Sequence, residues 1–240
     1  MAASIKAPSM FVTLGIDRSG SMMSFGDSVN TGLRTYINNL PQDATLRIYT
    51  FDTEKEVPLK NKRVGDINDE DLKRIDGAIK PRGSTTIFDF AVEEMKKQST
   101  MDGSTQFALF TDGQDNASSI TAQMFCEKVK AHQKKGVECV FLAANQDAMM
   151  QGSIYGFSKE KSLTVDCTNA QAALLVLAKT TSAACGTRGH PPISFSKLDR
   201  VHSAPAHHHT AAFPAPKPTP THAMIPPPPP PPVASLALHR

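Results

Sequence analysis

Three short stretches of this 240-residue sequence gather hydroxyl and carboxylate side chains. The first, "GIDRSGSMMS" (15–24), places Asp17, Ser19 and Ser21 at alternate positions after an apolar run. The second, "PRGSTT" (81–86), contains two adjacent threonines, and the third, "FTDGQDN" (110–116), contains Asp112 after another apolar run. None of the three stretches contains histidine or cysteine. Together these oxygens favour a hard divalent cation over zinc or copper.

The order of preference for such a site is Mg²⁺ first, then Mn²⁺ or Ca²⁺. Residues two apart in an extended loop point to the same side, so the hydroxyls of Ser19 and Ser21 can face one ion while Asp17 stands behind them. If the carboxylates act through water, the ion keeps most of its positive charge. Its open coordination position can then accept an Asp or Glu side chain from another protein.

The elements that must position these residues alternate along the chain. Apolar runs predict strands, and apolar residues at helical spacing predict the helices between them. The expected strands are 10–16, 46–51, 56–59, 106–111, 137–143 and 162–165. This rhythm predicts an α/β fold: a doubly wound (Rossmann-like), mostly parallel sheet of about six strands with helices on both faces. The short link between 46–51 and 56–59 predicts one antiparallel edge strand. In such sheets the functional crevice lies outside the carboxyl ends of the strands.

The three stretches resemble the motif set of a known family. "DRSGSM" (17–22) is similar to the DxSxS motif of the von Willebrand factor type A domain, whose metal-ion-dependent adhesion site is called the MIDAS. "GSTTIFDFA" (83–91) looks like the family's second element, and "LFTDGQDN" (109–116) resembles its third. The resemblance spans roughly residues 8 to 183. "VFLAANQDA" (140–148) looks most like stand-alone bacterial or viral-type members.

Carried over by position, the resemblance implies direct metal ligation by two serines and ligation by a threonine, directly or through water. Two aspartates would act mainly through bound water and hydrogen bonds. The metal-site residues expected in this way are Asp17, Ser19, Ser21, Thr85 and Asp112.

Some positions near the motifs depart from the pattern or allow another interpretation. Thr86 is the alternative to Thr85 as the ligand. Arg82 stands where the family commonly has a glycine or small residue, and Phe90 where it often has alanine. Asp115 and Asn116 are interpreted as helix-capping and loop residues rather than ligands.

Composition divides the chain into two parts. Fourteen of the 18 prolines and seven of the eight histidines follow residue 185. Residues 186–240 carry five basic residues against one acidic, which leaves 21 against 22 in residues 1–185. We therefore expect an α/β domain over 1–185 and a disordered His- and Pro-rich tail over 186–240. Within the tail, a polyproline II segment is expected at Pro226, Pro227, Pro228, Pro229, Pro230, Pro231 and Pro232.

That proline run resembles ligands of profilin, EVH1 or SH3 domains, although a passive spacer is an equal alternative. The near-balanced charge of residues 1–185 gives no support for nucleic-acid binding. No signal peptide or membrane-spanning run is recognisable, so a cytoplasmic monomer with reduced cysteines and no membrane contact is expected.

The leading hypothesis is a non-enzymatic, cation-dependent protein-binding module of the adhesion or scaffold type. A Mg²⁺-dependent phosphohydrolase is a second possibility. However, the haloacid-dehalogenase-type pattern has a second aspartate where this chain has Ser19, and no GxxxxGK[ST] phosphate-binding loop occurs. A third possibility is a scaffold in which the proline-rich tail does the binding.

Overall fold

The computed structural model describes residues 10–101, 103–144, 147–185 and 192–204. Within these ranges, strands form one sheet in the order β3-β2-β1-β4-β5-β6. All neighbours pair in parallel except β3, which runs antiparallel to β2 at one edge. This arrangement confirms the predicted fold class, including the antiparallel edge strand. The strands are β1 (Met10–Asp17), β2 (Thr45–Phe51), β3 (Lys55–Arg63), β4 (Ser104–Thr111), β5 (Glu138–Ala144) and β6 (Ser162–Val165).

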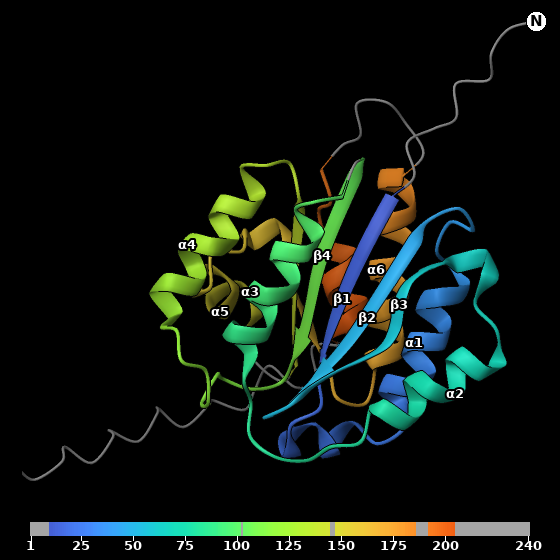
Figure 1. Ribbon diagram of the computed structural model, residues 1–240, viewed down its shortest axis with the longest axis horizontal. Coiled ribbons are helices and arrows are strands. Elements are labelled where there is room, and N and C mark those ends of the chain that lie inside the picture. Colours follow the sequence, from blue (N-terminus) through green and yellow to red (C-terminus); the bar gives the residue numbers. More distant parts are fainter. Residues whose placement is uncertain (1–9, 102, 145–146, 186–191, 205–240) are drawn as a thin grey trace, which may run out of the picture. The chain divides into compact units, whose positions relative to one another are not determined.

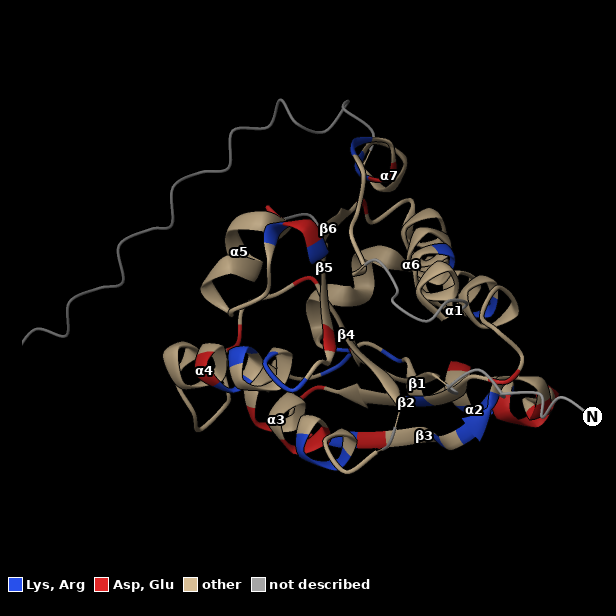
Figure 2. Ribbon diagram, turned by 90° about the horizontal axis from the view of Figure 1, so that it is seen from above, with Lys and Arg blue, Asp and Glu red and all other residues tan. Residues whose placement is uncertain are grey.

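Helices cover both faces of the sheet (Figures 1 and 2). One apolar layer joins the sheet to α1, α2 and α6, and a second layer on the opposite face joins it to α3, α4 and α5. No helix in the described ranges is long and apolar enough to cross a bilayer. The helices are α1 (Ser28–Asn38), α2 (Asp69–Ala78), α3 (Ile87–Gln98), α4 (Ala122–Gln133), α5 (Ala148–Ile154), α6 (Ala170–Cys185) and α7 (Lys197–Ser203).

The central strand β1 is buried along its whole length, as its apolar sequence predicts. Its neighbours are β2 and β4, so the chain order reverses across β1. Gly15 in this strand lies beside Tyr49 of β2. A Cβ atom at Gly15 would lie 2.3 Å from the tyrosine ring, so only glycine leaves room for that ring. The sheet therefore has a topological switch point between β1 and β4, where a functional crevice is expected.

The edge strand β3 is longer than the predicted 56–59. Its polar end, Lys60–Arg63, continues the pairing with β2, where Arg63 lies opposite Thr45. An edge strand needs only one buried face, so charged residues continue it without an apolar run.

The folded part extends past the predicted boundary at residue 185. Ile193 and Phe195 are buried in the same apolar layer as α6. After them, α7 packs near β6, and the Arg200 side chain donates to the carbonyl oxygens of Ser162 (2.6 Å) and Lys159 (2.9 Å). The composition change at residue 186 thus precedes the end of the fold, because two isolated apolar side chains suffice to anchor the segment. The rest of the expected tail, including the proline run 226–232, lies outside the described residues.

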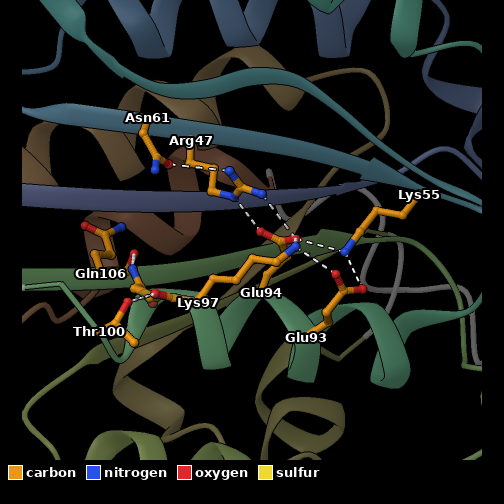
Figure 3. Close-up of polar contacts among 9 residues, drawn as sticks. Arg47, Lys55, Asn61, Glu93, Glu94, Lys97, Thr100 and Gln106 are labelled. Carbon is orange, nitrogen blue, oxygen red and sulfur yellow. Dashed lines mark hydrogen bonds and ion pairs between the residues drawn. The ribbon is translucent and has the colours of Figure 1, made fainter.

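A charged cluster lies between the sheet and α3, shown in Figure 3. Glu94 is fully buried, and its carboxylate pairs with Arg47 of β2, Lys55 of β3 and Lys97 of α3. Burial alone would raise the pKa of Glu94, but hydrogen bonds from Arg47, Lys97 and Lys55 outweigh it and lower the pKa to about 2. The cluster therefore holds an ionised carboxylate in the interior.

Candidate metal centre

The first oxygen-bearing loop begins at Asp17, the last residue of β1. The Asp17 carboxylate is buried and accepts two hydrogen bonds. One comes from the backbone N–H of Ser19 to Oδ1 (2.7 Å), and the other from the hydroxyl of Thr111 to Oδ2 (2.5 Å). Ser19 is buried and Ser21 is exposed, yet their Oγ atoms lie only 3.1 Å apart. The two hydroxyls thus face one point, although Gly20–Phe25 forms a short 3-10 helix and not the extended loop that the spacing argument assumed.

The third loop joins the first at the same place. It follows β4, the neighbour of β1, so Asp112 and Asp17 lie at adjacent strand ends. The Ser21 hydroxyl donates to Asp112 Oδ1 at 2.8 Å. A chain of short contacts therefore runs from Ser19 through Ser21 to Asp112, although the first and last are far apart in sequence.

The second loop brings Thr85 to the same point. Thr85 is buried, and its backbone N–H donates to Oδ1 of Asn116 at 2.9 Å. A Cβ atom built on Gly113 would lie 3.6 Å from the Thr85 hydroxyl and 3.8 Å from the Ser21 hydroxyl. The Thr85 and Ser21 hydroxyls therefore flank one glycine of the third loop. The alternative, Thr86, directly precedes α3 and donates its backbone N–H to the carbonyl oxygen of Asp52.

The remaining polar residues of the third loop hold the second loop in place. Asp115 Oδ1 accepts from the backbone N–H of Ile87 (2.7 Å), so it caps the start of α3 from a different loop. The backbone N–H of Asn116 donates to the carbonyl oxygen of Thr85 at 3.0 Å. Asp115 and Asn116 are capping and loop residues, as the sequence predicts.

The two carboxylates of the site lie in poorly hydrated surroundings. Burial raises the pKa of Asp17 to about 6, although the hydrogen bonds from Thr111 and Ser19 oppose the rise and the nearby Asp112 adds to it. Burial also raises the pKa of Asp112, against the hydrogen bond from Ser21. Both pKa shifts mean that burial makes the charged form of each carboxylate less favourable than it is in water.

The donor set fits a hard divalent ion. Hydroxyl and carboxylate oxygens converge from three loops, and such oxygens suit Mg²⁺, Mn²⁺ or Ca²⁺. Across the described ranges, no group of three or more His, Cys, Asp and Glu side chains could hold a metal.

Sequence reasoning missed the charged residues behind the loops. Arg18 lies between Asp17 and Ser19, and its side chain is 3% exposed and paired with Asp52. Arg82, noted only as a departure from the family pattern, pairs with the same aspartate. The sequence offers little signal for these contacts beyond an aspartate, Asp52, directly after the second expected strand.

The strand order and the position of the polar loops define the class of fold: a doubly wound α/β domain whose polar loops meet at its switch point. No family model matches the sequence, and no curated protein matches it. Solved structures do match. The vWF domain of the type V pili tip protein Mfa5 from Porphyromonas gingivalis has a TM-score of 0.61 at 11% identity, covering 77% of this chain and 98% of that one.

Two further structures share the fold. The pilus adhesin SpaC from Lactobacillus rhamnosus GG has a TM-score of 0.58 at 15% identity over 75% of this chain, which spans only 31% of SpaC. Proximal thread matrix protein 1 from the mussel byssus, with a zinc-occupied MIDAS motif, has a TM-score of 0.55 at 12% identity, over 74% of this chain and 48% of that one. The chain therefore has the fold of the von Willebrand factor type A domain.

Proposed function

We propose that this chain is a divalent-cation-dependent protein-binding module, in which a metal ion captures an acidic residue of a partner. The observation that carries the proposal is the convergence of Ser19, Ser21 and Asp112 through contacts of 3.1 and 2.8 Å, with the Thr85 hydroxyl beside them. The adhesin SpaC and the zinc-occupied MIDAS of the mussel protein support a binding role on the same fold.

In this proposal, Ser19, Ser21 and Thr85 would contact the ion, and Asp17 and Asp112 would act mainly through water and hydrogen bonds. Mg²⁺ is the first candidate, with Mn²⁺ and Ca²⁺ next. Neutral hydroxyl ligands leave most of the ion's charge uncompensated. The ion would therefore attract the carboxylate of a partner's Asp or Glu.

We propose binding rather than catalysis. The phosphohydrolase alternative would use Asp17 as a nucleophile, but Asp17 is buried, and Ser19 stands where that pattern needs a second aspartate. Mg²⁺-dependent turnover of a generic phosphate ester, lost in Asp17→Asn, would overturn this part of the proposal.

The direct test is calorimetric titration of the full chain with Mg²⁺, Mn²⁺ and Ca²⁺. Wild type should bind saturably, and Ser19→Ala/Ser21→Ala should not. Ser99→Ala/Ser153→Ala is a matched control, because both serines are exposed and donate only to helix carbonyl oxygens in their own vicinity. Absence of saturable binding by wild type with all three ions would refute the metal site.

The tail hypothesis is separable from the metal hypothesis. Removal of residues 205–240 deletes the proline run while keeping Ile193, Phe195 and α7. Chelator-sensitive capture of a partner should survive this deletion if the metal site does the binding. Capture that ignores chelator and vanishes with the deletion would favour a profilin, EVH1 or SH3-type partner at the tail.

A further inference from the structure

Arg18 occupies an unusual position in the first loop. It lies between two residues of the candidate metal centre, yet its guanidinium contacts other elements. Nε lies 3.2 Å from Asp52 Oδ2, and Nη1 donates to Glu56 Oε1 (2.5 Å) and to the carbonyl oxygen of Ala78 (3.3 Å). The first loop is thereby attached to the end of β2, to β3 and to the end of α2.

Arg82 makes the corresponding attachment from the second loop. Its Nε donates to Asp52 Oδ2 at 2.7 Å, and its Nη2 donates to Glu54 (2.9 Å) and Glu56 (3.3 Å). Its backbone N–H donates to the carbonyl oxygen of Arg18 at 2.7 Å. The residue that departs from the family pattern thus connects both loops.

Asp52 is the shared partner of the two arginines. It is 1% exposed, and a single oxygen, Oδ2, faces both guanidinium groups. Its Oδ1 accepts from the backbone N–H of Glu54 (2.6 Å), and its carbonyl oxygen accepts from Thr86 (3.0 Å), next to Thr85. We call Arg18, Asp52, Glu56 and Arg82 the arginine bridge.

We propose that the arginine bridge positions the first and second loops for cation binding, with Asp52 as its central positioning residue. The proposal rests on the metal-dependent function proposed above. Neutral hydroxyls are weak ligands, so they bind an ion well only where surrounding groups hold them in place. Removal of one partner from a buried ion pair leaves an uncompensated charge, so loss of Asp52 should disturb both loops that its two arginines attach.

A glycine in the second loop joins that loop to the first beside the bridge. Gly83 has a φ angle of +67°, which other residues rarely adopt, and its carbonyl oxygen accepts from the backbone N–H of Gly20 at 3.2 Å. A Cβ atom there would lie 3.4 Å from the hydroxyl of Thr53 and 3.6 Å from Cβ of Asp52. Both distances are ordinary van der Waals contacts, so it is the backbone angle and not a lack of space that favours glycine here.

The test measures Mn²⁺ affinity of the full chain from the electron paramagnetic resonance signal of free Mn²⁺. Asp52→Asn and Arg82→Gln should each weaken binding about tenfold. Arg82→Lys, which keeps the charge, should recover part of the loss. Glu94→Gln is the matched control, because it removes an equally buried carboxylate from three cations, Arg47, Lys55 and Lys97, away from the two loops. Its Mn²⁺ affinity should equal that of wild type even though its stability falls.

A second measurement does not depend on metal. Hydrogen exchange of the Gly20 and Thr86 amides in metal-free protein should be faster in Asp52→Asn and Arg82→Gln than in Glu94→Gln, since these amides join the two loops to each other and to Asp52. Unchanged Mn²⁺ affinity in both bridge variants would overturn the proposal, as would an equal loss in the control. If wild type bound no Mn²⁺, the proposed function would fail, and equal amide exchange in all variants would then overturn the bridge as well.

Discussion

Replacement of Glu94 by glutamine tests how the charged cluster behind the sheet contributes to stability. The carboxylate is fully buried and contacts Arg47, Lys55 and Lys97, which together hold its pKa at about 2 instead of the usual 4.5. One pKa unit corresponds to about 1.4 kcal/mol, so this difference corresponds to about 3 kcal/mol of stability at neutral pH. Glu94→Gln should lose about this amount.

The pH dependence of the loss follows from the direction of the pKa shift. A carboxyl group whose pKa is lower in the folded than in the unfolded protein stabilises the fold above its unfolded pKa. For Glu94 that contribution is complete above about pH 5.5 and disappears as the pH falls from 4.5 toward about 2. The difference in unfolding free energy between wild type and Glu94→Gln should therefore fall to less than about half by roughly pH 3.

Urea unfolding of both proteins at a series of pH values measures this difference directly. Glu93→Gln is the control, because Glu93 contacts the same Lys55 and Lys97 but its side chain is 48% exposed. Its loss should be below about 1 kcal/mol. A Glu94→Gln difference that stays constant between about pH 7 and pH 3 would refute the argument that an ionised, buried Glu94 stabilises the fold.

Three further predictions concern the metal, the last helix and the central strand. At a Mg²⁺ concentration about 100-fold above Kd, the free energy of unfolding of wild type should be about 2.7 kcal/mol higher than with chelator. Ser19→Ala/Ser21→Ala should show no such difference in urea unfolding. Phe195→Ala should lower the free energy of unfolding in urea by about 3 kcal/mol, because the ring is buried. Leu198→Ala, on the exposed side of α7, should lower it by less than about 0.5 kcal/mol. Equal losses would contradict the finding that the fold extends past residue 185. Gly15→Ala should cost about 1–3 kcal/mol, because its Cβ would overlap the ring across the strand pair, and unchanged stability would contradict that packing.

The sequence predicted the sheet because β1, β4 and β5 each contain a largely continuous apolar run. It also predicted which loops would meet, because the carboxyl ends of parallel strands share one edge. Asp17 and Asp112 lie far apart in sequence, yet β1 and β4 are neighbours, and the Ser21 hydroxyl contacts Asp112. That these residues bind a metal remains a prediction.

What could not be predicted depends on single side chains whose partners are distant. Arg18 is an arginine in a loop, and nothing in its neighbours indicates that Asp52 and Glu56 bury its charge. Phe195 follows a strong change in composition, and its burial depends on the surface that α6 and β6 leave open. Periodicity and composition describe segments, whereas these contacts depend on how segments meet.

The hydrogen bonds of Asp17 bear on how the site could work. Each oxygen of a carboxylate has two lone pairs, so one hydrogen bond to each oxygen still leaves room for a water molecule or an ion. Here Oδ1 accepts from Ser19 and Oδ2 accepts from Thr111, the last residue of the neighbouring strand. The aspartate is thus placed to fix the first loop against β4 and to supply negative charge behind the hydroxyls. An ion held mainly by those hydroxyls keeps its attraction for an external carboxylate, which is the property that a cation-dependent binding module requires.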